Sequence, residues 1–474
     1  MGSQILDKRW PWLTAAALVV LIAAATLFEV RLGGIDERPV GTAADIERLA
    51  ERSDVNVLFI LIDTLRADRL GMYGYERETS PDLDLLAARG VVFQRHLAQS
   101  SWTKASMASL WSGLYPTRSG VTRFDHVTPE EALLPAEILA EAGFRTVGLW
   151  RNGWVDPSFG FGQGFSIYEK PEGSARATNI HVENPTLTTR STDTGMLRSA
   201  EEFLRIFGGE RWFLYMHFMD LHEYLYDDET ALFGTTYSDV YDNSVRRENN
   251  LVGEFLVYLA RNGYLENTLI VFASDHGEAF GERGVEGHAR RLYRESTEVP
   301  FFLSFPFKLE PGVVISTRSR NLDIWPTVLD LLGLPPMEDV DGRSLVPEIL
   351  RAVRGEEPGP DETRAFAHLD QNWGTPGVGS AATVSVTEGP YRYVLSPSAS
   401  ENRIEELFDS SGDPLELKDV VRENPELVKR LREAVRQHLQ EIPPSPWGVE
   451  PSTLEIDEIN LQQLRALGYA LPGA

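Results

Sequence analysis

Carboxylate and imidazole side chains follow three apolar runs of this sequence directly. The runs and the polar residues after them are 57–62 with Asp63, 213–219 with Asp220 and His222, and 269–274 with Asp275 and His276. Two carboxylates and one imidazole suit Zn²⁺ or Mn²⁺ better than Ca²⁺ or Mg²⁺. We therefore expect Asp63, Asp275 and His276 to bind a divalent metal ion. Each residue alone could be a helix cap or a turn residue, but a metal site explains all three strand ends together.

A hydroxyl that could act as a nucleophile lies in the segment 101–113, SWTKASMASLWSG. Thr103 is expected to cap a helix that runs through Leu110, where free backbone N–H groups and the helix dipole favour an anion. A hydroxyl is almost never ionised at neutral pH, and a metal ion can supply the missing activation. The alternative is an ordinary N-cap of a core helix. Lys104 either contacts a transferred phosphoryl group or is an exposed lysine on the first helical turn.

Two further polar residues near these runs have alternative interpretations. Asp220 either fixes the orientation of His222 or joins His222 and His288 around a second metal ion, and we favour the first. His217 lies inside the apolar run 213–219, and we expect a core histidine with satisfied hydrogen bonds.

The elements that must position these residues follow from the alternation of short apolar runs with amphipathic segments. This pattern predicts an α/β fold, a mostly parallel central sheet with helices on both faces. In such sheets ligands bind at the carboxyl ends of the strands, so the polar strand ends should converge. The expected strands are 55–62, 145–150, 212–218, 268–273 and 299–305, and the expected helices include 196–207 and 251–261.

Composition shifts divide the chain into five parts. The catalytic domain is expected at 54–347, preceded by a polar tether at 29–53 with a short helix at 43–52. From 348 to 474 we expect a small α+β subdomain and a tail, with strands at 382–386 and 391–395 and a charged helix at 425–440.

Residues 10–28 carry no charge and follow Lys8 and Arg9. A helix of this length spans roughly 28 Å, close to the hydrocarbon thickness of a bilayer. The basic pair predicts that residues 1–9 are cytoplasmic and that the catalytic domain lies outside the cytoplasm, periplasmic or extracellular. The alternative is a signal peptide cleaved near the three alanines at 23–25, which would make the protein secreted.

Composition excludes several classes of protein. A formal charge of −26 disfavours a nucleic-acid binder, because phosphate backbones would be repelled. The absence of cysteine excludes disulfides, thiolate metal sites and cysteine nucleophiles.

The motifs of the chain resemble those of the sulfatase family within the alkaline phosphatase superfamily. The blocks follow the family's order from about residue 54 to 347, and a further match lies at 464–469. They are NVLFILIDTLRAD at 56–68, TSPDLDLLA at 79–87, SGLYP at 112–116, GQGF at 162–165, FMDLH at 218–222, SDHGE at 274–278, GH at 287–288, EVP at 298–300, DIWPTVLDLLG at 323–333 and LRALGY at 464–469.

The resemblance implies a role for each matched residue. Asp63, Asp275 and His276 resemble the family's metal ligands, and Thr103 takes the place of the nucleophile that completes the metal site. The histidines at 222 and 288 resemble those that hold the transferred group or protonate the leaving oxygen. Asn152 matches a position near the substrate pocket.

The sequence also departs from the sulfatase pattern. Formylglycine enzymes carry Cys or Ser in a C/S-x-P-x-R signature, whereas the aligned residues here are Thr103, Ala105 and Met107. Thr64 replaces a second acidic ligand. We therefore expect no formylglycine, and the Thr nucleophile resembles the phosphodiesterase, phosphatase and phospho-group transferase branches.

These observations favour a membrane-anchored, metal-dependent hydrolase of phosphate mono- or diesters. The substrate would be a small-molecule, lipid or glycan ester. Three alternatives remain: a sulfuric ester hydrolase, a transferase that moves a phospho-alcohol onto envelope glycans or lipids, and a degenerate binding module without activity. Family transferases usually carry several membrane helices, and a degenerate module should have lost a metal ligand, so hydrolysis is favoured.

Overall fold

The computed structural model describes residues 36–171, 193–361, 363–370, 372, 379–397 and 403–455, and the backbone of two strands at 175–179 and 189–191. Its centre is an eight-stranded sheet in which β11, β1, β9, β5 and β6 are parallel neighbours. β14 is antiparallel to β11 and to β2. The predicted mostly parallel sheet is thus confirmed. Its strands in spatial order are β15 (Val313–Ile315), β2 (Val91–Phe93), β14 (Phe301–Ser304), β11 (Thr268–Ala273), β1 (Asn56–Ile62), β9 (Trp212–Phe218), β5 (Arg145–Leu149) and β6 (Ile167–Glu169).

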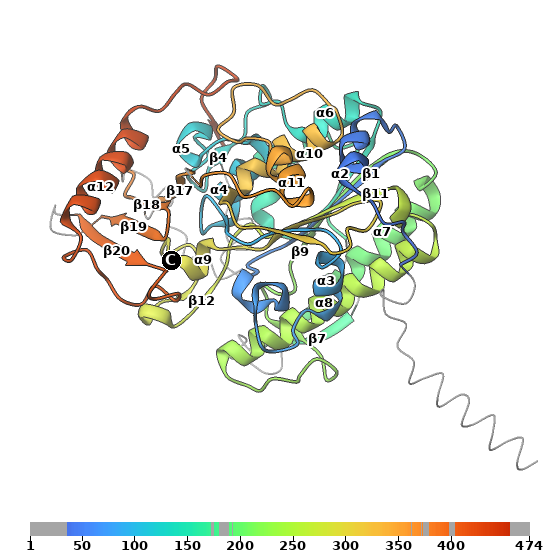
Figure 1. The fold of residues 1–474 in the computed structure, drawn as a ribbon, viewed down its shortest axis with the longest axis horizontal. Helices are drawn as coiled ribbons and strands as arrows, with labels where there is room; N and C mark the ends of the chain where they lie inside the picture. The colour runs from blue at the N-terminus through green and yellow to red at the C-terminus, as the bar shows by residue number, and fades with distance from the viewer. Residues whose placement is uncertain are drawn as a thin grey trace, which may run out of the picture.

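Helices cover both faces of this sheet (Figure 1). All seven residues of β1 are buried, and successive side chains point to opposite faces. Phe59 and Leu61 enter the core shared with α4 and α10, whereas Ile60 and Ile62 enter the core shared with α7 and α8. The helix bounds are α4 (Thr103–Ser112), α10 (Ile324–Leu331), α7 (Asp193–Phe207) and α8 (Tyr237–Arg261).

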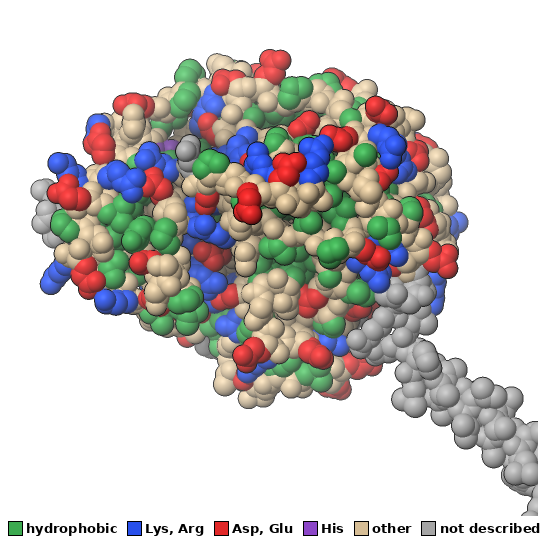
Figure 2. Space-filling model, in the orientation of Figure 1, with side chains coloured by type: hydrophobic (Ala, Val, Ile, Leu, Met, Phe, Trp, Pro, Cys, Tyr) green, Lys and Arg blue, Asp and Glu red, His purple; other side chains and the backbone are tan. Residues whose placement is uncertain are grey.

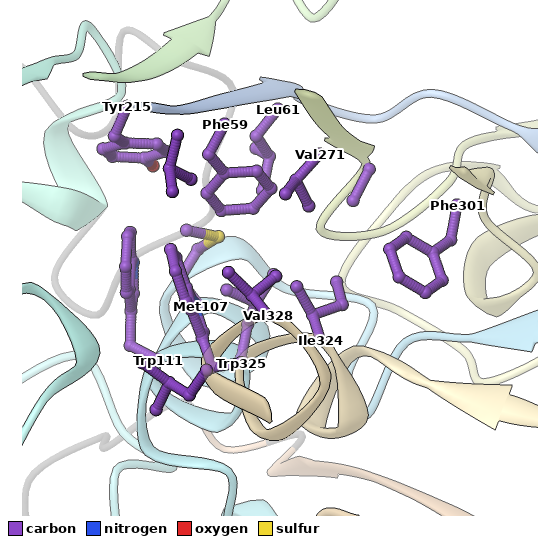
Figure 3. Close-up of a cluster of buried hydrophobic side chains, with 14 of the residues drawn as sticks. Phe59, Leu61, Met107, Trp111, Tyr215, Val271, Phe301, Ile324, Trp325 and Val328 are labelled. Carbon is purple, nitrogen blue, oxygen red and sulfur yellow. The ribbon is translucent and has the colours of Figure 1, made fainter. Parts of the chain in front are cut away.

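Aromatic side chains fix α4 against the sheet. Trp111 of α4 stacks on Trp325 of α10, with ring centroids 5.0 Å apart. Both rings meet Phe59 of β1 edge-on, as Figure 3 shows. This packing sets the position of the first residue of α4 above the carboxyl ends of the strands.

The C-terminal part forms a second, antiparallel sheet with one long helix, at the left of Figure 1. Helix α11 (Val346–Val353) precedes this sheet, and its Ile349 packs in the core of the large sheet. The predicted strands and charged helix are present. The elements are β17 (Ala365–Asp370), β18 (Ala382–Glu388), β19 (Tyr391–Ser396), β20 (Ile404–Asp409) and α12 (Pro425–Gln440).

Shorter elements connect these layers. The helices are α2 (Ala43–Glu47), α3 (Pro81–Ala87), α5 (Pro116–Ser119), α6 (Pro135–Glu141) and α9 (Arg294–Thr297). The strands are β3 (His96–Leu97), β4 (His126–Val127), β7 (Ala175–Asn179), β8 (Thr189–Ser191), β10 (Leu225–Tyr226), β12 (Ala279–Phe280), β13 (Glu286–Gly287), β16 (Ser319–Arg320) and β21 (Ser452–Thr453).

Several expectations lie outside the described residues: the cytoplasmic segment 1–9, the membrane segment 10–28, the start of the tether and the tail motif 464–469. Among the described residues, no helix combines the length and the apolar character that a membrane span requires. Acidic and basic side chains are interspersed over the face seen in Figure 2, so the net charge of −26 is not gathered in one patch there.

Candidate active site

The three polar strand ends converge, because β1 lies between β9 and β11 in the sheet. Asp63 follows β1, and Asp275 and His276 follow β11; all three side chains are fully buried. Nε2 of His276 lies 3.3 Å from Oδ2 of Asp275 and 3.8 Å from Oδ1 of Asp63. The parallel register therefore places two carboxylates and an imidazole at one point.

Thr103 lies at the same point, at the start of α4. Its hydroxyl is 3.1 Å from Nε2 of His276 and accepts a 3.3 Å hydrogen bond from Nδ2 of Asn152. Nδ1 of His276 lies 3.0 Å from the carbonyl oxygen of Gly277, so the ring proton sits on Nδ1 and Nε2 is free to accept. The Thr103 hydroxyl therefore donates its proton toward Nε2.

One detail of the expected helix start was wrong. Trp102, not Thr103, is the N-cap, because its backbone is extended while Thr103 is already helical. The hydroxyl of Thr103 does not close the helix end; it faces the sheet and is held by His276 and Asn152.

Two side chains hold Oδ2 of Asp63. Asn152, after β5, donates a 2.6 Å hydrogen bond to this oxygen. His217 of β9 lies 3.1 Å from it through Nε2, while the Tyr215 hydroxyl lies 2.7 Å from His217 Nδ1. His217 is a buried, hydrogen-bonded histidine, as expected, but sequence reasoning missed its place in the site. Its place follows from the register of β1 and β9, which sets His217 across from Leu61 and which the sequence alone does not show.

The hydrogen bonding of the remaining carboxylate oxygens of Asp63 and Asp275 indicates a cation site. Oδ1 of Asp275 accepts hydrogen bonds from the backbone N–H groups of Thr64 (3.3 Å) and His276 (2.9 Å). Oδ2 of Asp275 and Oδ1 of Asp63 are buried and accept no hydrogen bond from the described residues. Asp63, Asp275 and His217 offer ligand atoms within 4.8 Å of one another. Burying carboxylate oxygens without partners is costly, and a divalent ion would compensate them.

The pKa values of Asp63 and Asp275 reflect the concentration of negative charge at the candidate cation site. Burial, followed by the charge of Asp63, raises the pKa of Asp275 to about 7. Burial would also raise the pKa of Asp63, but the hydrogen bond from His217 and the neighbouring histidines lower it below its ordinary value. Thr64 does not add a ligand, because its hydroxyl donates to the carbonyl oxygen of Asp63.

Two further histidines continue the site toward the surface. The ring centroid of His288 lies 4.6 Å from that of His276 and 4.9 Å from that of His222. Nδ1 of His288 lies 3.1 Å from Oε2 of Glu278. Burial opposes protonation of His222, but Glu223 and the charge of Asp63 raise the pKa of His222 to about 9. The raised pKa favours the protonated form of His222, which can stabilise negative charge or donate a proton.

Lys104 is not the exposed lysine that one interpretation anticipated. Its side chain is fully buried, and its ammonium group donates a 2.6 Å hydrogen bond to the carbonyl oxygen of Phe124. The same group lies 3.5 Å from the ring centroid of Phe159. Burial lowers the pKa of Lys104 well below its ordinary value.

Asp220 lies in a second buried acidic cluster with Asp193 and Glu248. Its carboxylate accepts a 2.7 Å hydrogen bond from Arg247, and its backbone N–H donates to Asp193. Burial, followed by the charges of Asp193 and Asp220, raises the pKa of Glu248 well above its ordinary value. Sequence reasoning missed Asp193 and Glu248, which lie on helices α7 and α8.

The protein thus has an α/β fold with a mostly parallel sheet, and its convergent strand ends form a site that fits a divalent cation. A sulfatase family model matches residues 55–334, and a model of the C-terminal part of N-sulphoglucosamine sulphohydrolase matches residues 281–443. The chain is a hydrolase of the sulfatase family.

Similar proteins and solved structures are consistent with membership of the sulfatase family. An ulvan-active sulfatase from Formosa agariphila is 24% identical over 410 residues, covering 78% of this chain and 77% of that protein. A choline-sulfatase from Rhizobium meliloti is 35% identical over 205 residues, covering 40% and 35%. The crystal structure of a phosphonate monoester hydrolase from Agrobacterium radiobacter has a TM-score of 0.64 at 21% identity and covers 81% of this chain and 94% of that one. The last likeness shows the shared fold.

Proposed function

We propose that this protein hydrolyses phosphate mono- or diesters through a covalent intermediate on Thr103. The observation that carries the proposal is the placement of the Thr103 hydroxyl between Nε2 of His276 and the amide of Asn152, beside two carboxylates with unpartnered oxygens. This arrangement places a hydroxyl nucleophile directly beside a site that fits a divalent cation, which can activate the hydroxyl.

The side chain of Thr103 supports phosphorus over sulfur. A formylglycine is an aldehyde, made by oxidising the Cβ of Cys or Ser. The Cβ of threonine carries a methyl group, so the same oxidation would give a ketone. A geminal diol can expel sulfate without further attack at sulfur, whereas the adduct of a single hydroxyl must be released by water at the central atom. Phosphoryl adducts of alcohols are open to that attack.

The residues of this chain have distinct tasks in such a reaction. Asn152 donates a hydrogen bond to the Thr103 hydroxyl and fixes its direction. His222, whose raised pKa favours the protonated form, is suited to hold the transferred group or to protonate the leaving oxygen, with His288 beside it. Asp63, Asp275, His276 and Thr103 would hold the divalent ion, with Zn²⁺ or Mn²⁺ favoured over Ca²⁺ or Mg²⁺. A bound ion supplies Lewis-acid stabilisation and lowers the pKa of the hydroxyl.

Sulfate-ester hydrolysis is the second candidate, because the names of the relatives describe sulfatases. A turnover comparison on aryl phosphate, aryl phosphodiester, phosphonate and aryl sulfate separates the two candidates. We expect the phosphorus esters to be the better substrates and mass spectrometry to place a phospho-adduct on the peptide containing Thr103. Efficient sulfate turnover with an unmodified Thr103 would overturn the choice of phosphorus.

We also propose that the catalytic domain lies outside the cytoplasm on a single N-terminal membrane helix. The uncharged segment 10–28 after Lys8 and Arg9 supports this topology. In cells, the full-length chain should fractionate with membranes and be digested by protease added from the outer side. Recovery of the full-length chain as a soluble cytoplasmic protein would contradict the proposal.

A further inference from the structure

A basic pocket lies beside the candidate active site, between the β12–β13 hairpin and the segment that follows it. Its volume is about 730 Å³. The lining residues are Gly281, Gly284, Val285, Glu286, Ala289, Arg290 and Arg291.

The wall of the pocket is linked to the reaction centre by one chain neighbour and one hydrogen bond. Ala289 of its wall directly follows His288, whose ring lies against His276. The backbone N–H of Ala289 donates a 2.7 Å hydrogen bond to the carbonyl oxygen of Ser101, two residues before Thr103. A group attached to the leaving alcohol of an ester at Thr103 would therefore have the pocket within reach.

The lining of the pocket includes an arginine without an ion-pair partner among the described residues. Arg291 is half-buried, and its guanidinium group makes no ion pair or hydrogen bond that involves another described residue. Nearby arginines are engaged: Arg66 pairs with Asp68 and Glu282, and Arg283 pairs with Glu295. Among the described lining residues, Glu286 is the one carboxylate, and it is exposed. The half-buried Arg291 thus supplies a positive charge that no described carboxylate neutralises.

We infer that this pocket binds a second anionic group, a carboxylate, phosphate or sulfate, on the alcohol part of the ester. The inference rests on the proposed function, because it assigns the substrate class of the same site. A planar guanidinium binds an oxyanion through paired, charge-assisted hydrogen bonds. A chain with a formal charge of −26 repels a dianionic substrate in general, so recognition of one needs a local positive site.

The test compares two esters that differ only in the second anion: phenyl phosphate and 3-carboxyphenyl phosphate, with the two matching aryl sulfates. We expect the wild-type protein to have the higher kcat/KM for the carboxylated ester. In Arg291→Gln the ratio of the two kcat/KM values should fall about tenfold, mainly through KM, as expected for one charge-assisted hydrogen bond. The matched control is Arg422→Gln, an exposed arginine of the C-terminal subdomain, which should keep the wild-type ratio. Added salt should weaken the preference.

An unchanged ratio in Arg291→Gln would overturn the inference, and an unchanged ratio with an equal loss for both esters would indicate a structural role for Arg291. Calorimetry of the same two phosphate esters with Thr103→Ala measures the contribution of the pocket to binding affinity in the absence of turnover. If the wild-type protein cleaves no phosphate ester, the proposed function fails. A preference of Thr103→Ala for the carboxylated ester that is lost in the Thr103→Ala, Arg291→Gln double variant would still support the pocket.

Discussion

Nδ2 of Asn152 lies 2.6 Å from Oδ2 of Asp63 and 3.3 Å from the hydroxyl of Thr103. One amide thus connects a candidate metal ligand with the candidate nucleophile. The amide is itself fixed, because its oxygen accepts a 2.9 Å hydrogen bond from the backbone N–H of Trp154. Asn152 therefore sets the direction of both side chains.

Replacing Asn152 by Ala should lower kcat by about one to two powers of ten, as expected when a fixed hydrogen bond to a reacting group is lost. KM should change less, because the amide acts on protein groups. Asn262→Ala, an exposed asparagine after α8, is the matched control. Steady-state kinetics on the best ester measure kcat and KM of both variants. A wild-type kcat in Asn152→Ala would show that the reaction does not depend on the hydrogen bond from Asn152 to Thr103.

Asp275→Asn should lower the metal content and abolish turnover. The amide can keep a carbonyl oxygen toward the N–H groups of Thr64 and His276, but it removes the charge that faces the cation. Metal analysis of purified protein, with the exposed Asp228→Asn as control, measures the effect. Stoichiometric metal together with full activity in Asp275→Asn would show that the ligand assignment is wrong.

Thr103→Ala should cost at least three powers of ten in rate, a barrier increase of at least ~4 kcal/mol at 1.36 kcal/mol per decade. Thr103→Ser keeps a hydroxyl and should retain measurable turnover of the phosphate ester with an adduct on the serine. Rate measurements and peptide mass spectrometry test both variants. Undiminished activity in Thr103→Ala would rule out the covalent intermediate.

Glu248→Gln should make the protein more stable, relative to wild type, as the pH rises from 4 to 8. Burial raises the pKa of Glu248 in the folded state above its ordinary value of 4.5. The stabilising contribution of its proton is therefore complete below about pH 4.5 and is lost as the pH rises through the folded-state pKa. Glutamine keeps the neutral form at every pH. Urea unfolding of both proteins across this range measures the difference, and a difference that does not vary with pH would contradict the assignment.

Much of the fold follows from the sequence because the central strands are continuous apolar runs. The runs at 212–218 and 268–273 coincide with β9 and β11, and their polar ends indicated the site. The edge strand β15 and its neighbour β2 have three residues each, too few for a recognisable period.

The parts that the sequence did not predict depend on burial of polar groups. Only the second half of α8 was expected, because its first half carries Asp242, Asn243 and Glu248 on buried positions, where the apolar period is broken. The sequence left two interpretations of Lys104, contact with a transferred group or exposure, because the carbonyl group that binds it comes from a loop 20 residues away. Such partners are set by tertiary contacts and leave no local pattern.

The alternation along β1 has a consequence for how this protein can change. Odd-numbered residues of the strand pack on one side of the sheet and even-numbered residues on the other, and Asp63 continues the same count. Insertion or deletion of a single residue within β1 would exchange the two sets of side chains and displace the carboxylate at once. Insertions and deletions within β1 therefore disrupt both cores and the site together. New sequence can be accommodated in the loops beyond the strand ends.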